Sequence, residues 1–303
     1  ELEKKDVSFI ILPDSNYPQL LKQIKNPPFL LYVKGQVPDG TWFSKSIAVV
    51  GTRRTTQYGR EVTKILTEEL VANGFAIVSG LAMGVDAISH MTALENNGSP
   101  AGEAGKTIAV LGCGVDCCNP AENQSLYNSI LQSGNCIVSE FPLGMKPAKW
   151  TFPARNRIIA GLSQAVLVTE GAEDSGSLIT ANYAIKFGRP VFAVPGPITS
   201  SMSKGPYALI QKGATLVTSA KDIIKSITGI TSTTSIKGRK SIKSIKGDSP
   251  EENKILEVLE NEALHFDEMI RKTKFQSSKL SITLTLMEIK GMVKSLDGGM
   301  FSI

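Results

Sequence analysis

The sequence predicts an α/β protein with a doubly wound parallel sheet, followed by a small C-terminal winged-helix module. First, short apolar runs alternate with helix-like stretches from residue 46 to residue 227, the order of elements in a sheet covered by helices. Second, these runs are continuously apolar, as in strands that are buried on both faces. Third, the composition changes abruptly at residue 228 and again at residue 250, which sets a short C-terminal region apart.

The elements of the sheet region can be placed in order along the chain. Residues 1–45 form a lead-in segment, with a helix over Asn16–Ile24 and a strand over Phe29–Val33. The expected strands are Ile47–Val50, Ala76–Val78, Thr107–Leu111, Cys136–Ser139, Ala165–Thr169, Val191–Val194 and Thr215–Val217. The expected helices cover residues 58–73, 84–96, 121–133, 154–162, 176–187, 205–212 and 220–227. Residues 46–227 are therefore expected to form one α/β domain.

Two regions follow the sheet. Residues 228–249 are rich in Ser, Thr, Lys and Gly, which predicts a flexible basic linker; non-specific affinity for nucleic acid is the less favoured interpretation. Residues 250–303 predict a helix that opens at Ser249-Pro250, two further helices over His265–Lys272 and Ser277–Ile289, and a hairpin around Asp297-Gly298. This order is typical of a winged-helix domain. Its acidic balance favours a protein contact at least as much as DNA.

Composition and charge narrow the class of protein. With 303 residues, 42% hydrophobic and 20% charged, the chain resembles an ordinary globular protein. No apolar run approaches the roughly 18 residues that span a bilayer, and the start of the chain is not a signal peptide. We expect a cytoplasmic protein without a membrane partner or a metal, whose four cysteines are reduced. The net charge is +3 over residues 1–228, +5 over 229–247 and −3 over 248–303, so a polyanion site in the sheet region must be a local cluster.

Glycines gather where the strands of the sheet end. Ligands bind to doubly wound sheets at the carboxyl ends of the strands, and bare turns there would let a ligand come close. The glycines are Gly51, Gly80, Gly84, Gly112, Gly114, Gly144, Gly171, Gly176 and Gly196. The dinucleotide-binding fingerprint G-x-G-x-x-G is absent after the first strand, and Gly112-Cys113-Gly114 matches only its first half. No cofactor is expected.

The turn after the first strand of the parallel sheet is a candidate binding site. Gly51 ends the strand, and Thr52, Arg53 and Arg54 lead into a helix that begins near Tyr58. A strand that feeds a helix through a glycine turn offers free backbone N–H groups and a positive helix end, both of which suit an anion. The arginines could bind a phosphate bidentately. An ordinary turn with solvated arginines is the alternative.

A second cluster follows the fourth strand of the parallel sheet and reaches the same edge. It interleaves cations with aromatic rings, a combination that suits single-stranded nucleic acid because cations bind phosphates and an aromatic ring stacks on an unpaired base. Its residues are Lys149, Trp150, Phe152, Arg155 and Arg157. Alternatively, the rings fill the core and the arginines pair with Glu140 or Glu170.

Two more turns lie at this edge. Gly176 and Ser177 stand at a helix start among small hydroxyl residues, which suits an anion. Asp86 and His90 are four residues apart on another helix, so they share a face. A hydrolase could use such a pair, but a structural hydrogen bond is the favoured interpretation. We therefore name no catalytic residue.

A series of motifs occurs in an order that resembles the DNA-processing protein A (DprA/Smf) family. The motifs are AVVGTRRTTQYG, IVSGLAMGVDAISH, TIAVLGCGVD, SEFPLG, FPARNRIIAGLSQAVLVTEG, SGSLITANYA and VFAVPG. The resemblance covers about residues 8–227 and continues more loosely through the C-terminal module. It departs from the family in the loop Asn96–Gly105, which is longer than expected, and in the absence of the helical domain that commonly comes first. The second departure suggests a truncated chain or a shorter relative.

The resemblance implies a function as well as a fold. It implies an extended Rossmann-like domain that binds single-stranded DNA, dimerises through residues 205–227, protects incoming DNA and loads the RecA recombinase in natural transformation or recombination. By motif, the Gly51–Arg53 turn would hold phosphate, while Lys149 and Phe152 would bind backbone and base, with Arg155 nearby. The implied DNA-binding set is Gly51, Thr52, Arg53, Arg54, Lys149, Phe152, Arg155, Arg157, Gly176 and Ser177.

An enzyme is the alternative to a binding protein. The fold is similar to that of nucleotide phosphoribohydrolases of the lysine decarboxylase-like group, which carry the signature P-G-G-x-G-T-x-x-E. At the equivalent place this chain has EGAEDSGSLITA, without the double glycine or the final glutamate. The general acid or base that this chemistry needs is thus missing from its expected position, and a non-enzymatic protein is preferred.

Overall fold

The computed structural model describes residues 2–38, 45–95, 105–228, 247–259, 264–296 and 299–302. The chain divides into two compact units, Glu1–Thr231 and Ser232–Ile303. The expected linker over residues 228–249 and the loop Asn96–Gly105 fall mostly outside the described residues, so both stay predictions. Within the described ranges, no helix is long and apolar enough to cross a membrane.

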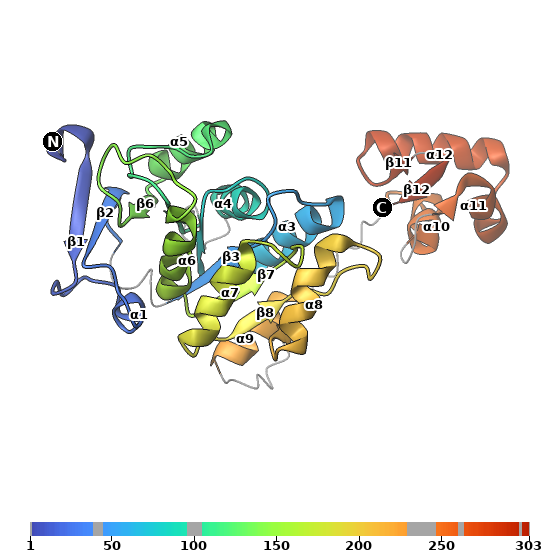
Figure 1. The fold of residues 1–303 in the computed structure, drawn as a ribbon. Coiled ribbons are helices and arrows are strands. Elements are labelled where there is room, and N and C mark those ends of the chain that lie inside the picture. The colour runs from blue at the N-terminus through green and yellow to red at the C-terminus, as the bar shows by residue number, and fades with distance from the viewer. Residues whose placement is uncertain are drawn as a thin grey trace. The chain divides into compact units, whose positions relative to one another are not determined.

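The described part of the larger unit is a nine-stranded sheet with helices on both faces (Figure 1), in the strand order β1-β2-β6-β5-β4-β3-β7-β8-β9. The strands are β1 (Val7–Ile11), β2 (Leu30–Gly35), β3 (Ser46–Val50), β4 (Ala76–Ser79), β5 (Thr107–Val110), β6 (Cys136–Ser139), β7 (Ala165–Val168), β8 (Val191–Ala193) and β9 (Thr215–Leu216). The helices are α1 (Gln19–Lys22), α3 (Gln57–Ala72), α4 (Val85–Glu95), α5 (Gln124–Gln132), α6 (Thr151–Leu162), α7 (Ser177–Lys186), α8 (Lys204–Gln211) and α9 (Ala220–Thr228). The doubly wound α/β fold is confirmed.

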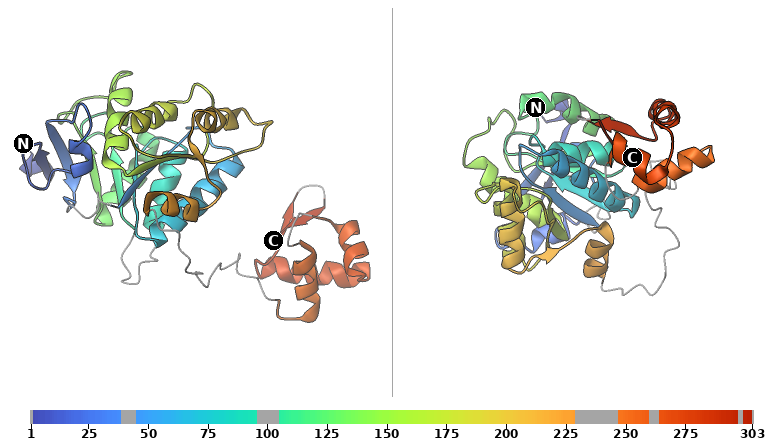
Figure 2. Two further views of the ribbon diagram at one scale, coloured as in Figure 1. Left: turned by 90° about the horizontal axis from the view of Figure 1, so that it is seen from below. Right: turned by 90° about the vertical axis from the view of Figure 1, so that its right-hand side faces the viewer.

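The sequence predicted a parallel sheet, but the observed sheet also contains antiparallel pairings. All pairings from β6 through β9 are parallel, but β1 pairs antiparallel with β2, and β2 pairs antiparallel with β6. The sequence prediction missed β1 and made the first helix too long. Gly35 lets β2 lie against β6, because a Cβ there would be 2.4 Å from the Asn135 carbonyl oxygen. Figure 2 shows β1, and with it the N-terminus, at one end of the sheet.

Alternate residues of each central strand face different helices. In β3, Ala48 and Val50 belong to an apolar cluster that also contains residues of α1, α6, α7 and α8. Ile47 and Val49 belong to a second cluster, with residues of α3, α4 and α9. All five residues of β3 are buried. The continuous apolar run is therefore buried on both faces of the sheet, as the sequence predicted.

The smaller unit is a winged-helix domain. Its elements are α10 (Pro250–Leu259), β10 (Leu264–His265), α11 (Phe266–Thr273), α12 (Ser277–Ile289), β11 (Lys294–Leu296) and β12 (Met300–Ser302). The expected hairpin is present as the antiparallel pair β11–β12, although its turn, Asp297-Gly298, lies outside the described residues. The sequence prediction missed β10, which adds a two-residue strand beside β12.

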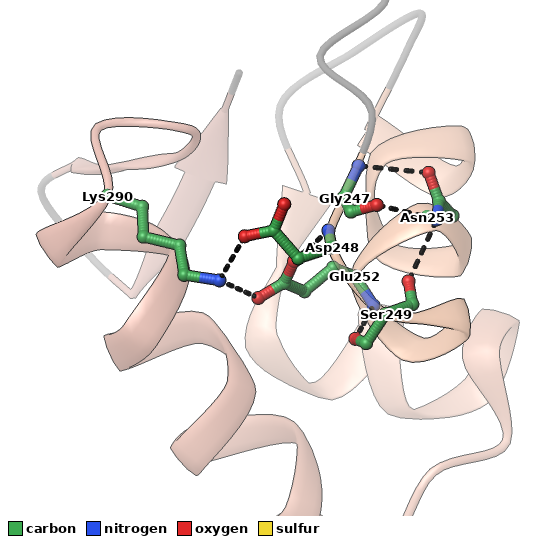
Figure 3. A network of polar contacts seen from close by, with 6 residues as sticks. All are labelled: Gly247, Asp248, Ser249, Glu252, Asn253 and Lys290. Carbon is green, nitrogen blue, oxygen red and sulfur yellow. Dashed lines mark hydrogen bonds and ion pairs between the residues drawn. The ribbon is translucent and has the colours of Figure 1, made fainter.

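A polar network fixes the start of α10 to the end of α12 (Figure 3). The Ser249 hydroxyl accepts a hydrogen bond from the Glu252 backbone N–H at 3.1 Å, which caps α10 as the sequence predicted. The Lys290 ammonium donates to Asp248 and to Glu252, each at 2.8 Å. The hydrogen bond that Lys290 donates to Glu252 lowers the pKa of Glu252 below its usual value.

The exposed face of α12 is poor in available charge. Its Lys279 pairs with Glu251 at 2.9 Å, and Lys290, just beyond its end, is held in the network described above. Large aliphatic side chains stand exposed between them, at Ile282, Leu286 and Ile289. The exposed surface of α12 therefore presents aliphatic side chains, and its lysine takes part in an ion pair.

Candidate nucleic-acid interface

A pocket of about 580 Å³ opens at the carboxyl ends of the parallel strands. It lies where the order of the sheet reverses on either side of β3, the place where doubly wound sheets bind ligands. The residues on the candidate list that line it are Gly51, Thr52, Arg53, Arg54, Lys149, Phe152, Arg155, Gly176 and Ser177. Segments more than 100 positions apart in the sequence therefore meet in one cavity.

The basic turn is attached to the end of β7 by Glu170. The Glu170 carboxylate accepts hydrogen bonds from the Thr56 backbone N–H at 2.9 Å and from the Thr56 hydroxyl at 2.6 Å. The Glu170 carbonyl accepts from the Thr52 N–H at 2.7 Å. Gly59 makes this approach possible, because a Cβ there would lie 2.0 Å from the Glu170 carboxylate. The expectation of free backbone N–H groups is therefore wrong at Thr52 and Thr56, and the charged donors of the turn are the side chains of Arg53 and Arg54.

Those side chains are available. Arg53 and Arg54 are exposed, as is Lys149 across the pocket. Among the described residues, none of the three has a carboxylate partner within ion-pair distance. The Arg53 guanidinium lies over the Phe152 ring at 5.5 Å from its centroid. The two clusters expected from the sequence thus meet, and the cations are free to bind phosphate.

Phe152 is partly exposed on the first turn of α6. This helix begins three residues before the expected start, and it tolerates Pro153 because N–H groups of a first turn have no partner within the helix. Phe152 lies outside the apolar clusters that the described residues of the larger unit form. Its ring lines the pocket instead.

Arg155 also borders the pocket, but it is only 4% exposed. Its guanidinium donates to the Gly80 carbonyl at 2.6 Å and to the Val110 carbonyl, which joins the ends of β4 and β5. Burial raises the pKa of nearby Asp86, and Arg155 partly offsets that rise. Asp86 accepts a hydrogen bond from the Gly80 N–H at 3.1 Å. Arg155 is therefore a positioning residue that holds the pocket floor.

Arg157 is not among the residues that line the pocket. It forms an ion pair with Glu140 and donates to the Asn26 carbonyl at 2.9 Å. This pairing is the alternative that the sequence left open for the arginines of this cluster. For Arg157 that alternative is correct, since one helix turn of about 3.6 residues points Arg155 and Arg157 in different directions.

The start of α7 supplies hydroxyl groups. The Ser175 and Ser177 hydroxyls lie 2.8 Å apart, and the Asn156 amide donates to the Gly176 carbonyl at 3.2 Å. A Cβ at Gly176 would meet nothing within 4 Å, so this glycine borders open space. Thr180 is 1% exposed and lines the pocket. The sequence analysis missed Asn156 and Thr180, although both lie inside the motifs that it singled out.

The Asp86 and His90 pair does not form a catalytic dyad. His90 is fully buried, and its Nδ1 lies 2.7 Å from the Thr107 hydroxyl. Burial lowers the pKa of His90 to about 3, so the imidazole stays neutral. The favoured structural interpretation agrees with this geometry, with Thr107 as the partner of His90.

Comparison with known proteins identifies the family. A family model described as DNA recombination-mediator protein A matches residues 8–228. The chain belongs to this family. A second model, described as the DprA winged helix domain, matches residues 242–299. The resemblance drawn from the motifs is therefore confirmed.

Individual members of the DNA recombination-mediator protein A family match most of the chain. Protein Smf of Synechocystis is 41% identical over 232 residues, which is 76% of this chain but 56% of that protein's length. The X-ray structure of DNA processing protein A from Streptococcus pneumoniae has a TM-score of 0.66 and 41% identity, covering 74% of this chain and 76% of that one. A structure of DNA processing protein A from Helicobacter pylori, described for its single-stranded DNA binding mode, has a TM-score of 0.63 and 32% identity. The match covers 74% of this chain and 96% of that one.

Proposed function

We propose that this chain binds single-stranded DNA in the pocket at the carboxyl edge of the sheet. One observation carries the proposal: Arg53, Arg54 and Lys149, which have no carboxylate partner among the described residues, line a single cavity with the partly exposed Phe152, and Arg53 lies over the Phe152 ring. Cations that track phosphates beside a ring that stacks on a base are the components of a sequence-tolerant single-strand site. The hydroxyls of Ser175 and Ser177 add polar contacts for the backbone.

A nucleotide-cleaving enzyme is the less favoured function. Glu170, the first acidic residue after β7, is occupied by Thr56. Asp86 and Asp174 both line the pocket, but Asp86 is only 7% exposed and accepts a hydrogen bond from the Gly80 N–H, while Asp174 is exposed to solvent. A general acid or base must reach the proton that it transfers, whereas Glu170 and Asp86 already accept hydrogen bonds from protein groups. We therefore propose a binding protein that is not an enzyme.

The single-strand test compares an oligothymidylate with a duplex of the same length. We expect tight binding of the single strand and weak binding of the duplex, measured by gel shift or anisotropy. If about three phosphates are neutralised, log K should fall with log salt concentration with a slope of about −2, from about −0.7 per contact. Equal affinity for the duplex would contradict the proposal. A flat salt response would indicate a small-molecule pocket.

The setting in the cell is proposed from the family. We propose a cytoplasmic homodimer that protects incoming single-stranded DNA and loads the RecA recombinase onto it in natural transformation or recombination. The domain plan would be a lead-in over residues 1–45, a DNA-binding domain over 46–227, a linker over 228–249 and a winged-helix domain over 250–303. Adding RecA to the gel shift tests the hand-over: the oligothymidylate should move from this protein to RecA.

The dimer would form through residues 205–227. The support is that β9 is the last strand of the sheet and carries Leu216 49% exposed, while Ile224 and Ile227 of α9 are only partly buried. Sedimentation at micromolar concentration should show a dimer, and Leu216→Lys should give a monomer. The matched control is Ile185→Lys on α7, since Ile185 is equally exposed at 48% but lies outside the segment. A wild-type protein that sediments only as a monomer would contradict the proposal.

A further inference from the structure

An exposed tryptophan stands immediately beside the pocket. Trp150 is 60% exposed, although tryptophan is one of the most strongly buried residue types on average. It is the N-cap residue of α6, between Lys149 and Phe152, which both line the pocket. Trp150 is not among the lining residues. Its indole therefore belongs to the surface next to the pocket.

The indole is held in place without being covered. Its ring packs edge-to-face on Phe141, with centroids 5.7 Å apart and an interplanar angle of 84°. Phe141 is itself 7% exposed, so it offers a fixed support. An edge-to-face contact leaves at least one face of the indole free for another ring. Trp150 thus has the rigidity and the exposure that a stacking platform needs.

The surface around Trp150 is positive. Lys146 and Lys149 are exposed on the same segment, and neither has an ion pair or hydrogen bond among the described residues. The nearby acids are already engaged: Asp116 pairs with Lys5 at 2.7 Å and accepts from the Gly144 N–H at 2.9 Å, and Glu140 pairs with Arg157. Within residues 144–150, two exposed lysines, Lys146 and Lys149, therefore precede an exposed aromatic ring.

We propose that Trp150 is a second, outer stacking platform, which guides single-stranded DNA out of the pocket along residues 144–150. The inference rests on the proposed function. A pocket of about 580 Å³ has the size of a small-molecule site, so a longer strand must leave it across the surface. Phe152 would stack an inner base and Trp150 an outer one, with Lys146 and Lys149 binding the phosphates between and beyond them.

The test uses Trp150 as its own reporter. The chain contains two tryptophans, Trp42 and Trp150, so a Trp42→Phe protein reports on Trp150 alone. Adding an oligothymidylate of about 16 nucleotides should quench its fluorescence, whereas one of about four nucleotides, the lower limit of single-strand site sizes, should quench it much less. Unchanged fluorescence with the longer strand, at concentrations where it is bound, would overturn the inference.

Variants measure the contribution to affinity. Trp150→Ala should weaken binding of the longer oligothymidylate about 5- to 150-fold, the effect of losing one stacked base, and leave the shorter one unaffected. Trp150→Phe should retain most of the affinity. The matched control is Phe29→Ala, which removes another exposed ring (65% exposed) from the residue just before β2. The salt slope should be unchanged, because no phosphate contact is lost.

The outcomes separate this inference from the proposed function. If Trp150→Ala binds both lengths normally while Phe152→Ala loses affinity, the outer platform is wrong and the pocket still binds single-stranded DNA. If Trp150→Ala weakens both lengths equally and lowers the melting temperature, Trp150 only supports the fold through Phe141, and the inference falls. If the wild-type protein binds no single strand of either length, both fall.

Discussion

Arg155→Ala is expected to unfold the larger unit at a melting temperature roughly 6–20 °C below that of the wild type, corresponding to a loss of about 3–5 kcal/mol. The reason is that the buried guanidinium donates to the Gly80 and Val110 carbonyls, and both would lose their partner. Asp86, also buried, would lose its nearby positive charge. Differential scanning calorimetry measures the change. Arg54→Ala is the control: it removes an exposed arginine, which should alter stability by no more than about 0.5 kcal/mol.

The pH dependence of the stability of Arg155→Ala tests the role of Asp86. Burial raises the folded-state pKa of Asp86 above its usual 3.8, so ionisation of Asp86 costs stability, and the loss appears as pH rises through the raised pKa. Without Arg155 the pKa should rise further, so the destabilisation should be larger at pH 7 than at pH 5. Adding Asp86→Asn keeps a hydrogen-bond acceptor for Gly80 and should recover part of the stability at pH 7. A loss that is independent of pH, with no recovery in the double variant, would exclude this electrostatic explanation.

The strands of the parallel sheet could be predicted because burial on both faces leaves a continuous apolar run. Ile47–Val50 is such a run, and every residue in it is buried. β1 gave no comparable signal. It is an edge strand whose Ser8 and Phe9 are exposed, and its partner β2 is an antiparallel neighbour whose place in the sheet depends on contacts far away in sequence. Local periodicity does not carry that information.

The edge at which the site lies could also be predicted, because the carboxyl ends of parallel strands always meet there. The function of single residues at that edge could not. The sequence predicted a bare turn at Gly80 that is open to a ligand. A Cβ there would lie 2.3 Å from the Arg155 guanidinium, so protein atoms fill the space beside this glycine. Arg155 and Arg157 looked equivalent in the sequence, yet one holds the pocket floor and the other pairs with Glu140 outside it. Side-chain direction and burial decide these roles.

The same limit applies to Phe152, for which the sequence left a core position and a ligand platform open. The ring lies under the Arg53 guanidinium at 5.5 Å, so the two side chains form one unit of the proposed site. A cation over one face of the ring leaves the other face for a base. The same cation can bind the phosphate of the nucleotide that stacks there. Substitutions at the two positions should therefore interact, although each removes a different kind of contact.

Arg53→Ala and Phe152→Ala should both weaken oligothymidylate binding, with different signatures. Losing Arg53 should make the salt slope shallower by about 0.7, because one phosphate contact disappears. Losing Phe152 should cost about 1–3 kcal/mol of binding free energy with the salt slope unchanged. Because the two side chains touch, the double variant should lose less than the sum of the single losses, with a coupling of about 0.5 kcal/mol or more. Thermal melts decide whether the ring acts on DNA or on the fold. A core phenylalanine cut to alanine costs about 3–5 kcal/mol of stability, whereas a pocket-lining Phe152 should melt close to the Phe29→Ala control. A large drop in melting temperature with DNA affinity retained per folded molecule would make Phe152 a core residue and remove the central contact of the proposed site.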